Sequence, residues 1–126
     1  MRLHHVGVAV KNLDAAVAHH QAQGLKLAHR EVVAAQKVEV AFMGEGPWVE
    51  LVSGEAVAKF IEKRGEGQHH VAFAVPSIAA ELDKEKKAGR SPIDAAARPG
   101  AWGHKVAFLH PKDHNGVLIE LVEEAH

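Results

Sequence analysis

The stretch Leu3-His4-His5-Val6-Gly7-Val8-Ala9-Val10 returns later in the chain as Gln68-His69-His70-Val71-Ala72-Phe73-Ala74-Val75, so that His5 and His70 occupy equivalent places. Two further pieces return in the same order: Val40-Ala41-Phe42 as Val106-Ala107-Phe108, and Glu50-Leu51-Val52 as Glu120-Leu121-Val122. A repeat of this length is typical of a duplicated supersecondary unit, with insertions confined to turns. We therefore expect two copies of one unit.

Each half has the pattern of a strand, a helix and three more strands, because apolar residues alternate in short runs and a capping residue precedes each helical stretch. Strands are predicted at 3–10, 25–33, 37–43 and 48–52, and again at 68–75, 91–97, 103–109 and 116–122. Helices are predicted after Asn12 and after Ser77, with a shorter one at 56–64. The bulky valines of the first strand should pack on a helix.

This pattern predicts an α+β fold in which two tandem βαβββ modules form an eight-stranded curled sheet around a metal cleft, with the helices outside. The chain is expected to be a single domain. Module one covers about 1–53, a linking helix about 54–66, and module two about 67–126.

Composition limits the classes of function. The net charge is −1 with no long run of either sign, which gives no support for binding nucleic acid or an anionic membrane. The absence of cysteine excludes disulfides, thiolate zinc sites and a cysteine nucleophile. No long apolar stretch and no signal-peptide pattern occur, so a cytoplasmic protein is expected.

The repeat also selects a candidate site. His5 and His70 share a strand face with Gly and Ala, which leaves an open approach to each imidazole. Glu50 and Glu120 lie inside apolar strands, where a buried carboxylate is costly unless it is paired or binds a cation. The alternative is that both glutamates point outward on edge strands.

Two imidazoles and two carboxylates suit one octahedral divalent metal ion, with two positions left for water or substrate. We expect cobalt, with manganese, nickel, zinc or iron as alternatives. Open positions are typical of a catalytic metal site. The other histidines are not expected to be ligands. His19, His20 and His29 are expected to be surface side chains, and His4 and His69 alternate away from the cleft. His110 and His114 have i, i+4 spacing, but Pro111 and Asn115-Gly116 argue against a helix that would present them.

Three motifs carry a resemblance along the whole chain: the two histidine strands, and Phe108-Leu109-His110-Pro111-Lys112-Asp113 followed by Gly116-Val117-Leu118-Ile119-Glu120-Leu121. With them the sequence resembles the vicinal oxygen chelate superfamily, and within it the epimerases that act on methylmalonyl-CoA. The resemblance implies an acyl-CoA substrate, a homodimer, and a metal held by His5, Glu50, His70 and Glu120.

The same resemblance adds Glu39 as an acid/base residue, which the repeat does not select because its counterpart is Lys105. Glu120 would then be both a ligand and the second base. Other functions stay open: a lactoylglutathione lyase would use the same fold and a similar ligand set, and a non-catalytic protein could hold a small ligand without metal. An extradiol dioxygenase fits less well, because it needs only three protein ligands.

Overall fold

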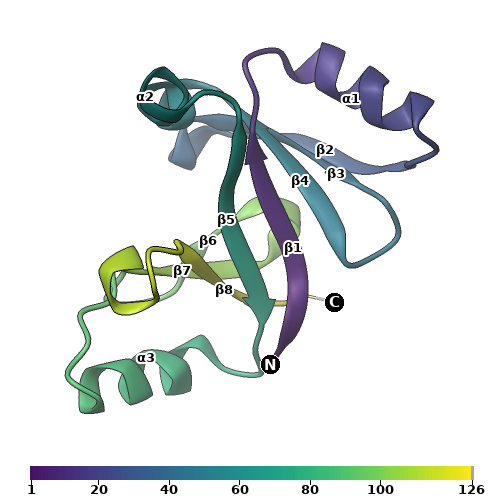
Figure 1. The fold of residues 1–126 in the computed structure, drawn as a ribbon. Helices are drawn as coiled ribbons and strands as arrows, with labels where there is room; N and C mark the ends of the chain where they lie inside the picture. The colour runs from purple at the N-terminus through teal and green to yellow at the C-terminus, as the bar shows by residue number, and fades with distance from the viewer. Residues whose placement is uncertain (126) are drawn as a thin grey trace. The chain divides into compact units, whose positions relative to one another are not determined.

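The computed structural model describes residues 1–125 and contains eight strands and three α-helices (Figure 1). The strands are β1 (Arg2–Ala9), β2 (Leu27–Val33), β3 (Val38–Met43), β4 (Trp48–Ser53), β5 (Gly67–Ala74), β6 (Arg98–Pro99), β7 (Lys105–Leu109) and β8 (Ile119–Glu123). The helices are α1 (Leu13–Ala22), α2 (Glu55–Arg64) and α3 (Ile78–Lys87). Among the described residues, none of the helices has the length and apolar character needed to cross a membrane.

The strands belong to one mixed sheet with the order β2-β3-β4-β1-β5-β8-β7-β6. This order confirms the eight-stranded α+β fold, and the two βαβββ series follow one another along the chain as predicted. By its internal contacts the chain divides into two compact units, one of residues 5–69 and one of residues 1–4 with the chain from His70 onward. Each unit is described separately below.

In the unit of residues 5–69, β1 pairs in parallel with β4, while β4–β3 and β3–β2 are antiparallel. Asn12 caps α1 by accepting a hydrogen bond from the Ala15 amide, as the sequence predicts. The helix packs against β3 and β4 (Figure 1). Six buried residues form the core between them: Val10, Leu13, Val17, Ala41, Met43 and Leu51.

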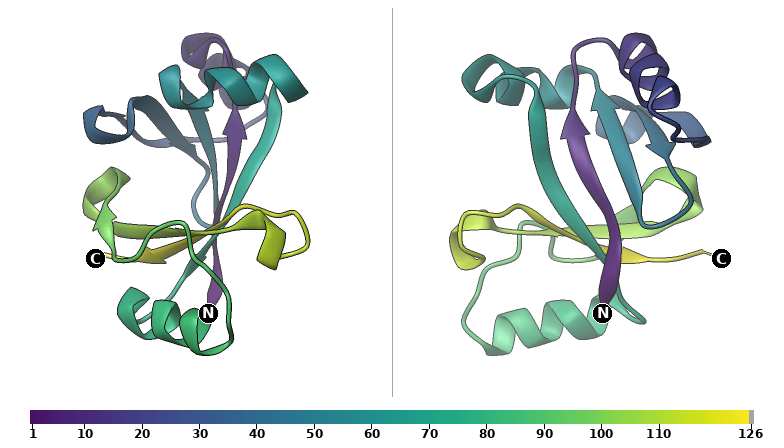
Figure 2. Two further views of the ribbon diagram at one scale, coloured as in Figure 1. Left: turned by 90° about the vertical axis from the view of Figure 1, so that its left-hand side faces the viewer. Right: turned by 45° about the vertical axis from the view of Figure 1, so that its right-hand side comes forward.

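The other unit repeats this arrangement. Strand β5 is parallel to β8, β8–β7 and β7–β6 are antiparallel, and α3 packs against β8 (Figure 2). Ser77 caps α3 through a hydrogen bond from the Ala80 amide. The core cluster that includes residues of α3 consists of Val75, Ile78, Leu82, Ala107, Leu109 and Leu121, which are the repeat counterparts, one for one, of the six core residues of the first unit.

The two faces of the sheet therefore have different roles. Because side chains alternate along a strand, Leu51 points toward α1 and Glu50 points to the opposite face. Val8 and Val10 pack with the α1 core, which confirms the expected packing of the bulky valines and places His5 on the same face as Glu50. We call the face that carries His5 and Glu50 the ligand face, and we use the same name for the face that carries His70 and Glu120.

The predicted strand at 91–97 is wrong. The structure has only the two-residue strand β6, which begins at Arg98 opposite Val106. Ahead of it, the Asp94 carboxylate accepts a hydrogen bond from the Phe108 amide at 2.8 Å, and the Ile93 and Asp94 amides both donate to the Phe108 carbonyl. All three hydrogen bonds involve the same residue of β7, Phe108, so the segment ahead of β6 forms a loop and not a β-ladder with β7.

Candidate functional site

The first His–Glu pair joins β1 to β4. The parallel register places Glu50 opposite Gly7, two residues beyond His5. His5 Nε2 lies 3.3 Å from Glu50 Oε1. Both residues are buried, and Glu50 keeps only 7% of its surface exposed.

The second pair joins β5 to β8 in the same way. Ala72 lies opposite Glu120, again two residues beyond the histidine. His70 Nε2 lies 3.0 Å from Glu120 Oε1, and Glu120 is also 7% exposed. The repeat in sequence is therefore a repeat of one local geometry.

A phenylalanine supports each pair from the next strand. Phe42 lies opposite Glu50 and Phe108 lies opposite Glu120. The Phe42 ring meets the His5 ring edge to face, with centroids 5.4 Å apart, and Phe108 meets His70 at 5.8 Å. These contacts restrict the orientation of both imidazoles, as the ligands of a metal site require.

The alternative of outward-pointing glutamates on edge strands is wrong. Strands β4 and β8 each have a neighbour on both sides, and both carboxylates are buried. A buried carboxylate needs a cation or hydrogen-bond donors to offset its lost hydration. His5, Glu50, His70 and Glu120 each offer one ligand atom from a buried side chain, so the chain has a group of residues that fits a divalent metal.

A family model described as the Glyoxalase/Bleomycin resistance protein/Dioxygenase superfamily matches residues 4–108. The chain belongs to this superfamily. The match confirms the resemblance that the strand motifs indicate, since the vicinal oxygen chelate fold is the fold of this group.

Relatives in the superfamily cover nearly the whole chain. The uncharacterized protein YqjC of Bacillus subtilis is 39% identical over 97% of this chain and 91% of the relative. The ethylmalonyl-CoA/methylmalonyl-CoA epimerase of Cereibacter sphaeroides is 36% identical over 95% of this chain and 96% of the relative. A solved structure of Streptomyces coelicolor methylmalonyl-CoA epimerase, in complex with 2-nitronate-propionyl-CoA, has a TM-score of 0.93 and 33% identity, covering 100% of this chain and 99% of that chain.

Glu39, the acid/base residue implied by the resemblance to this superfamily, is not brought together with the His5–Glu50 pair. It shares a face of β3 with Ala41 and Met43, and that face is packed under α1. Glu39 Oε2 accepts a hydrogen bond from Arg30 Nε at 3.0 Å, and Arg30 also pairs with Asp14 of α1 at 2.7 Å. The structure therefore places Glu39 on the helix face rather than the ligand face.

Arg30 is a residue that the sequence did not single out. Hydrogen bonds to Glu39 first, and then to Asp14, raise the pKa of its guanidinium above the ordinary value, because both carboxylates favour the charged form. The cluster of Asp14, Arg30 and Glu39 links the first turn of α1 to β2 and β3. In this cluster Glu39 is an ion-pair partner of Arg30, which is a structural role.

Four of the other histidines take structural positions. His114 Nε2 lies 2.6 Å from the buried Glu85 of α3, and His110 accepts a hydrogen bond from the Lys112 amide at the start of a short turn. His4 is fully buried and its ring packs edge to face on His104. The ring of His69 packs on Phe60.

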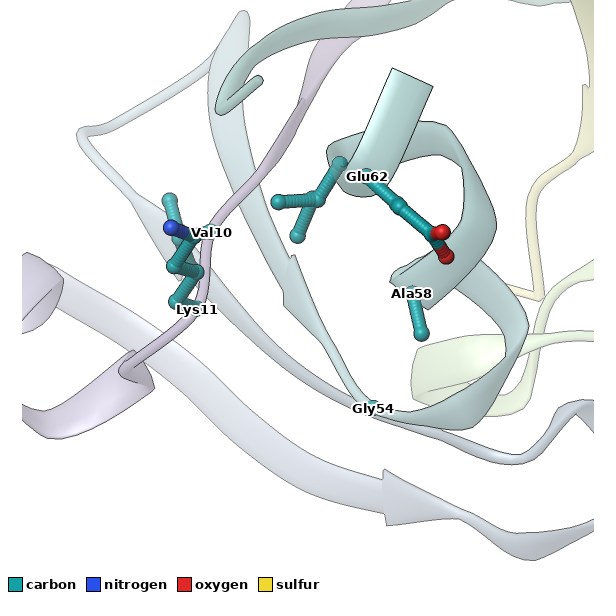
Figure 3. Close-up of a pocket in the computed structure, with 6 residues that line it drawn as sticks. Val10, Lys11, Gly54, Ala58 and Glu62 are labelled. Carbon is teal, nitrogen blue, oxygen red and sulfur yellow. The ribbon is translucent and has the colours of Figure 1, made fainter. Parts of the chain in front are cut away.

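A separate hollow of about 420 Å³ lies in the unit of residues 5–69, between the end of β1 and helix α2 (Figure 3). Its lining consists of Val10, Lys11, Gly54, Ala58, Ile61 and Glu62. None of the four metal-ligand candidates lines it. The backbone amide of Lys11 donates a hydrogen bond to the Glu66 carboxylate at 2.8 Å.

Proposed function

We propose that this protein is a metal-dependent epimerase that interconverts the two epimers of methylmalonyl-CoA. The observation that carries the proposal is the pair of equivalent, buried His–Glu pairs, one presented by each βαβββ series. The relatives from Cereibacter sphaeroides and Streptomyces coelicolor support the choice of an acyl-CoA substrate, because both are named as epimerases of such thioesters.

His5, Glu50, His70 and Glu120 would together hold one divalent ion. Imidazole nitrogen and carboxylate oxygen suit cobalt, manganese, nickel, zinc and iron, and an ion that takes six ligands would still have positions for water or substrate. When bound, the ion would supply positive charge to the enolate oxygen that forms as the α-proton leaves.

The protein itself must move the proton. Inversion requires one group to remove the proton between the thioester and the carboxylate, and another to return a proton on the opposite face. Glu120 is one of these groups in our proposal. A carboxylate has two oxygens, so Glu120 can give one to the metal and use the other for the proton.

The proposed function predicts isotope exchange together with inversion. A single epimer of methylmalonyl-CoA, incubated with metal-loaded protein in deuterated water, should become a mixture of both epimers with deuterium at the α-carbon. The epimer ratio and the deuterium content are followed in the same sample, with chelator-treated protein as the control. If neither changes with any of the five metals, the proposal fails. Conversion of the glutathione–methylglyoxal hemithioacetal instead would favour the lyase.

Metal should also stabilise the folded protein in a pH-dependent way. At about a hundred times its dissociation constant it should add about 2.7 kcal/mol to the free energy of unfolding. Protons compete with the metal for imidazole nitrogens, whose ordinary pKa is about 6.5, so this stabilisation should be present above that pH and lost as pH falls through it. Melting temperatures with and without chelator, at pH 7.5 and pH 5, give the test. Equal values at pH 7.5 would contradict a site specific to the folded state.

A further inference from the structure

Strand β2 contains an irregularity that changes which of its side chains reach the ligand face. Leu27 lies opposite Met43, but His29, two residues later, lies opposite Phe42, only one residue back along β3. Such a bulge shifts the alternation of the side chains that follow, and bulges often aim a side chain at an active site. After it, His29 and Glu31 are opposite Phe42 and Val40.

This register places His29 and Glu31 on the same face as His5 and Glu50. Phe42 links the two groups, because its ring contacts the His5 ring at 5.4 Å and lies 6.4 Å from the His29 ring. His29 Nε2 lies 2.7 Å from Glu31 Oε1, so the imidazole holds the carboxylate in position. The side chains are 28% and 32% exposed, which leaves both within reach of a bound molecule.

Strands β1 to β4 carry three carboxylates, and their positions assign them different roles. Glu50 is on the ligand face and is a proposed metal ligand. Glu39 is on the face covered by α1 and is held by Arg30. Glu31 is the remaining carboxylate, and it lies on the ligand face without being needed as a ligand.

The equivalent position of the second unit differs in charge. Arg98 lies opposite Val106, the repeat counterpart of Val40, and its guanidinium carbon is 5.4 Å from the centre of the Phe108 ring. A guanidinium stays charged and cannot accept a proton at neutral pH. Arg98 therefore cannot be a proton acceptor in the second unit, where the proposed function uses Glu120.

We infer that Glu31 is the second acid/base residue of the proposed epimerase, with His29 as its positioning residue. In one direction the Glu31 carboxylate takes the α-proton, and the C–H electron pair stays on the substrate as an enolate. The group on the other face then gives its proton to the carbon, so that one C–H bond breaks and one forms. Exchange with water restores both groups. This inference rests on the proposed function.

The test compares Glu31→Gln with Glu39→Gln. Both changes remove one negative charge at nearly constant volume, on opposite faces of neighbouring strands. Glu31→Gln should lower kcat by about 10²–10⁴-fold, the usual contribution of one positioned acid/base group. Glu39→Gln should stay within a few-fold of the parent. Metal content, melting temperature and the affinity for propionyl-CoA by calorimetry should be the same in Glu31→Gln as in the parent.

Glu31→Asp and His29→Gln complete the set. Glu31→Asp keeps a carboxylate and should therefore recover part of the kcat that Glu31→Gln loses. If Glu31 had only a structural role, the two variants should have similar kcat values. His29→Gln should lower kcat less than Glu31→Gln does, without loss of metal. Inversion by Glu31→Gln at the parent rate overturns the inference, as does loss of its metal or a collapse of activity in Glu39→Gln alone. A parent protein that fails to invert methylmalonyl-CoA overturns the proposed function instead.

Discussion

Replacing His70 with alanine is expected to remove both the metal and the epimerase activity. His70 supplies one of the two imidazole nitrogens of the proposed site, and its partner Glu120 would remain buried without it. Loss of a group that only supports a ligand typically costs about 10–100-fold in metal affinity, so loss of the ligand itself should cost more. The measurement is the metal content after dialysis, together with a titration of the chelated protein by cobalt.

His69→Ala is the matched control. It removes an imidazole from the adjacent position of β5, where the ring packs on Phe60 at a centroid distance of 4.9 Å and is not one of the four proposed metal ligands. This variant should keep its metal. If His70→Ala binds cobalt as tightly as the parent, His70 is not a ligand and the proposed site is wrong.

The repeat explains why so much of the fold could be predicted. Duplicated positions give the same evidence twice, because both halves of the sequence show the same division into bulky and small residues. The six core residues of one unit therefore have six counterparts in the other, and both helix caps are where Asn12 and Ser77 indicate. The His–Glu pairs could be selected for the same reason, since each pair has the same register in its sheet.

The sequence does not determine which face of the sheet carries Glu39. Strand β3 is apolar on both faces, with Val40 and Phe42 on one and Ala41 and Met43 on the other, so alternation alone does not say which face is covered. A small residue such as Ala41 suggests open space, but in the folded chain it gives room to α1. Only the packing of the helix decides between the two.

The role inferred for Glu31 depends on a feature that has no local signal in the sequence. The bulge in β2 follows from how its hydrogen bonds register with β3, and without it His29 and Glu31 would alternate with the opposite phase. His29 alone resembles a surface histidine. The loop ahead of β6 is a similar case, because contacts of Asp94 with Phe108 replace the ladder that its composition suggests.

Glu50 and Glu120, the two carboxylates proposed as metal ligands, are predicted to differ in catalysis although they are equivalent in the repeat. Glutamine keeps an oxygen for the metal but cannot accept a proton, so Glu120→Gln should lower kcat by about 10²–10⁴-fold even when metal is saturating. Glu50→Gln should bind metal more weakly and then, once saturated, turn over within about tenfold of the parent, well above Glu120→Gln. The measurement is kcat at increasing metal concentration for both variants. Equal losses would mean that neither carboxylate transfers the proton, or that both do.

Isotope exchange makes the prediction for Glu120 sharper. With one base on each face, each base removes the α-proton of one epimer. Glu120→Gln and Glu31→Gln should therefore both invert the centre about 10²–10⁴-fold more slowly than the parent. Each should still exchange the proton of one epimer with deuterated water, and the two variants should exchange opposite epimers. The assay starts from each epimer separately and follows deuterium by mass spectrometry. Exchange of the same epimer by both variants would place the two carboxylates on one side of the substrate, and a two-base mechanism with Glu31 would then be excluded.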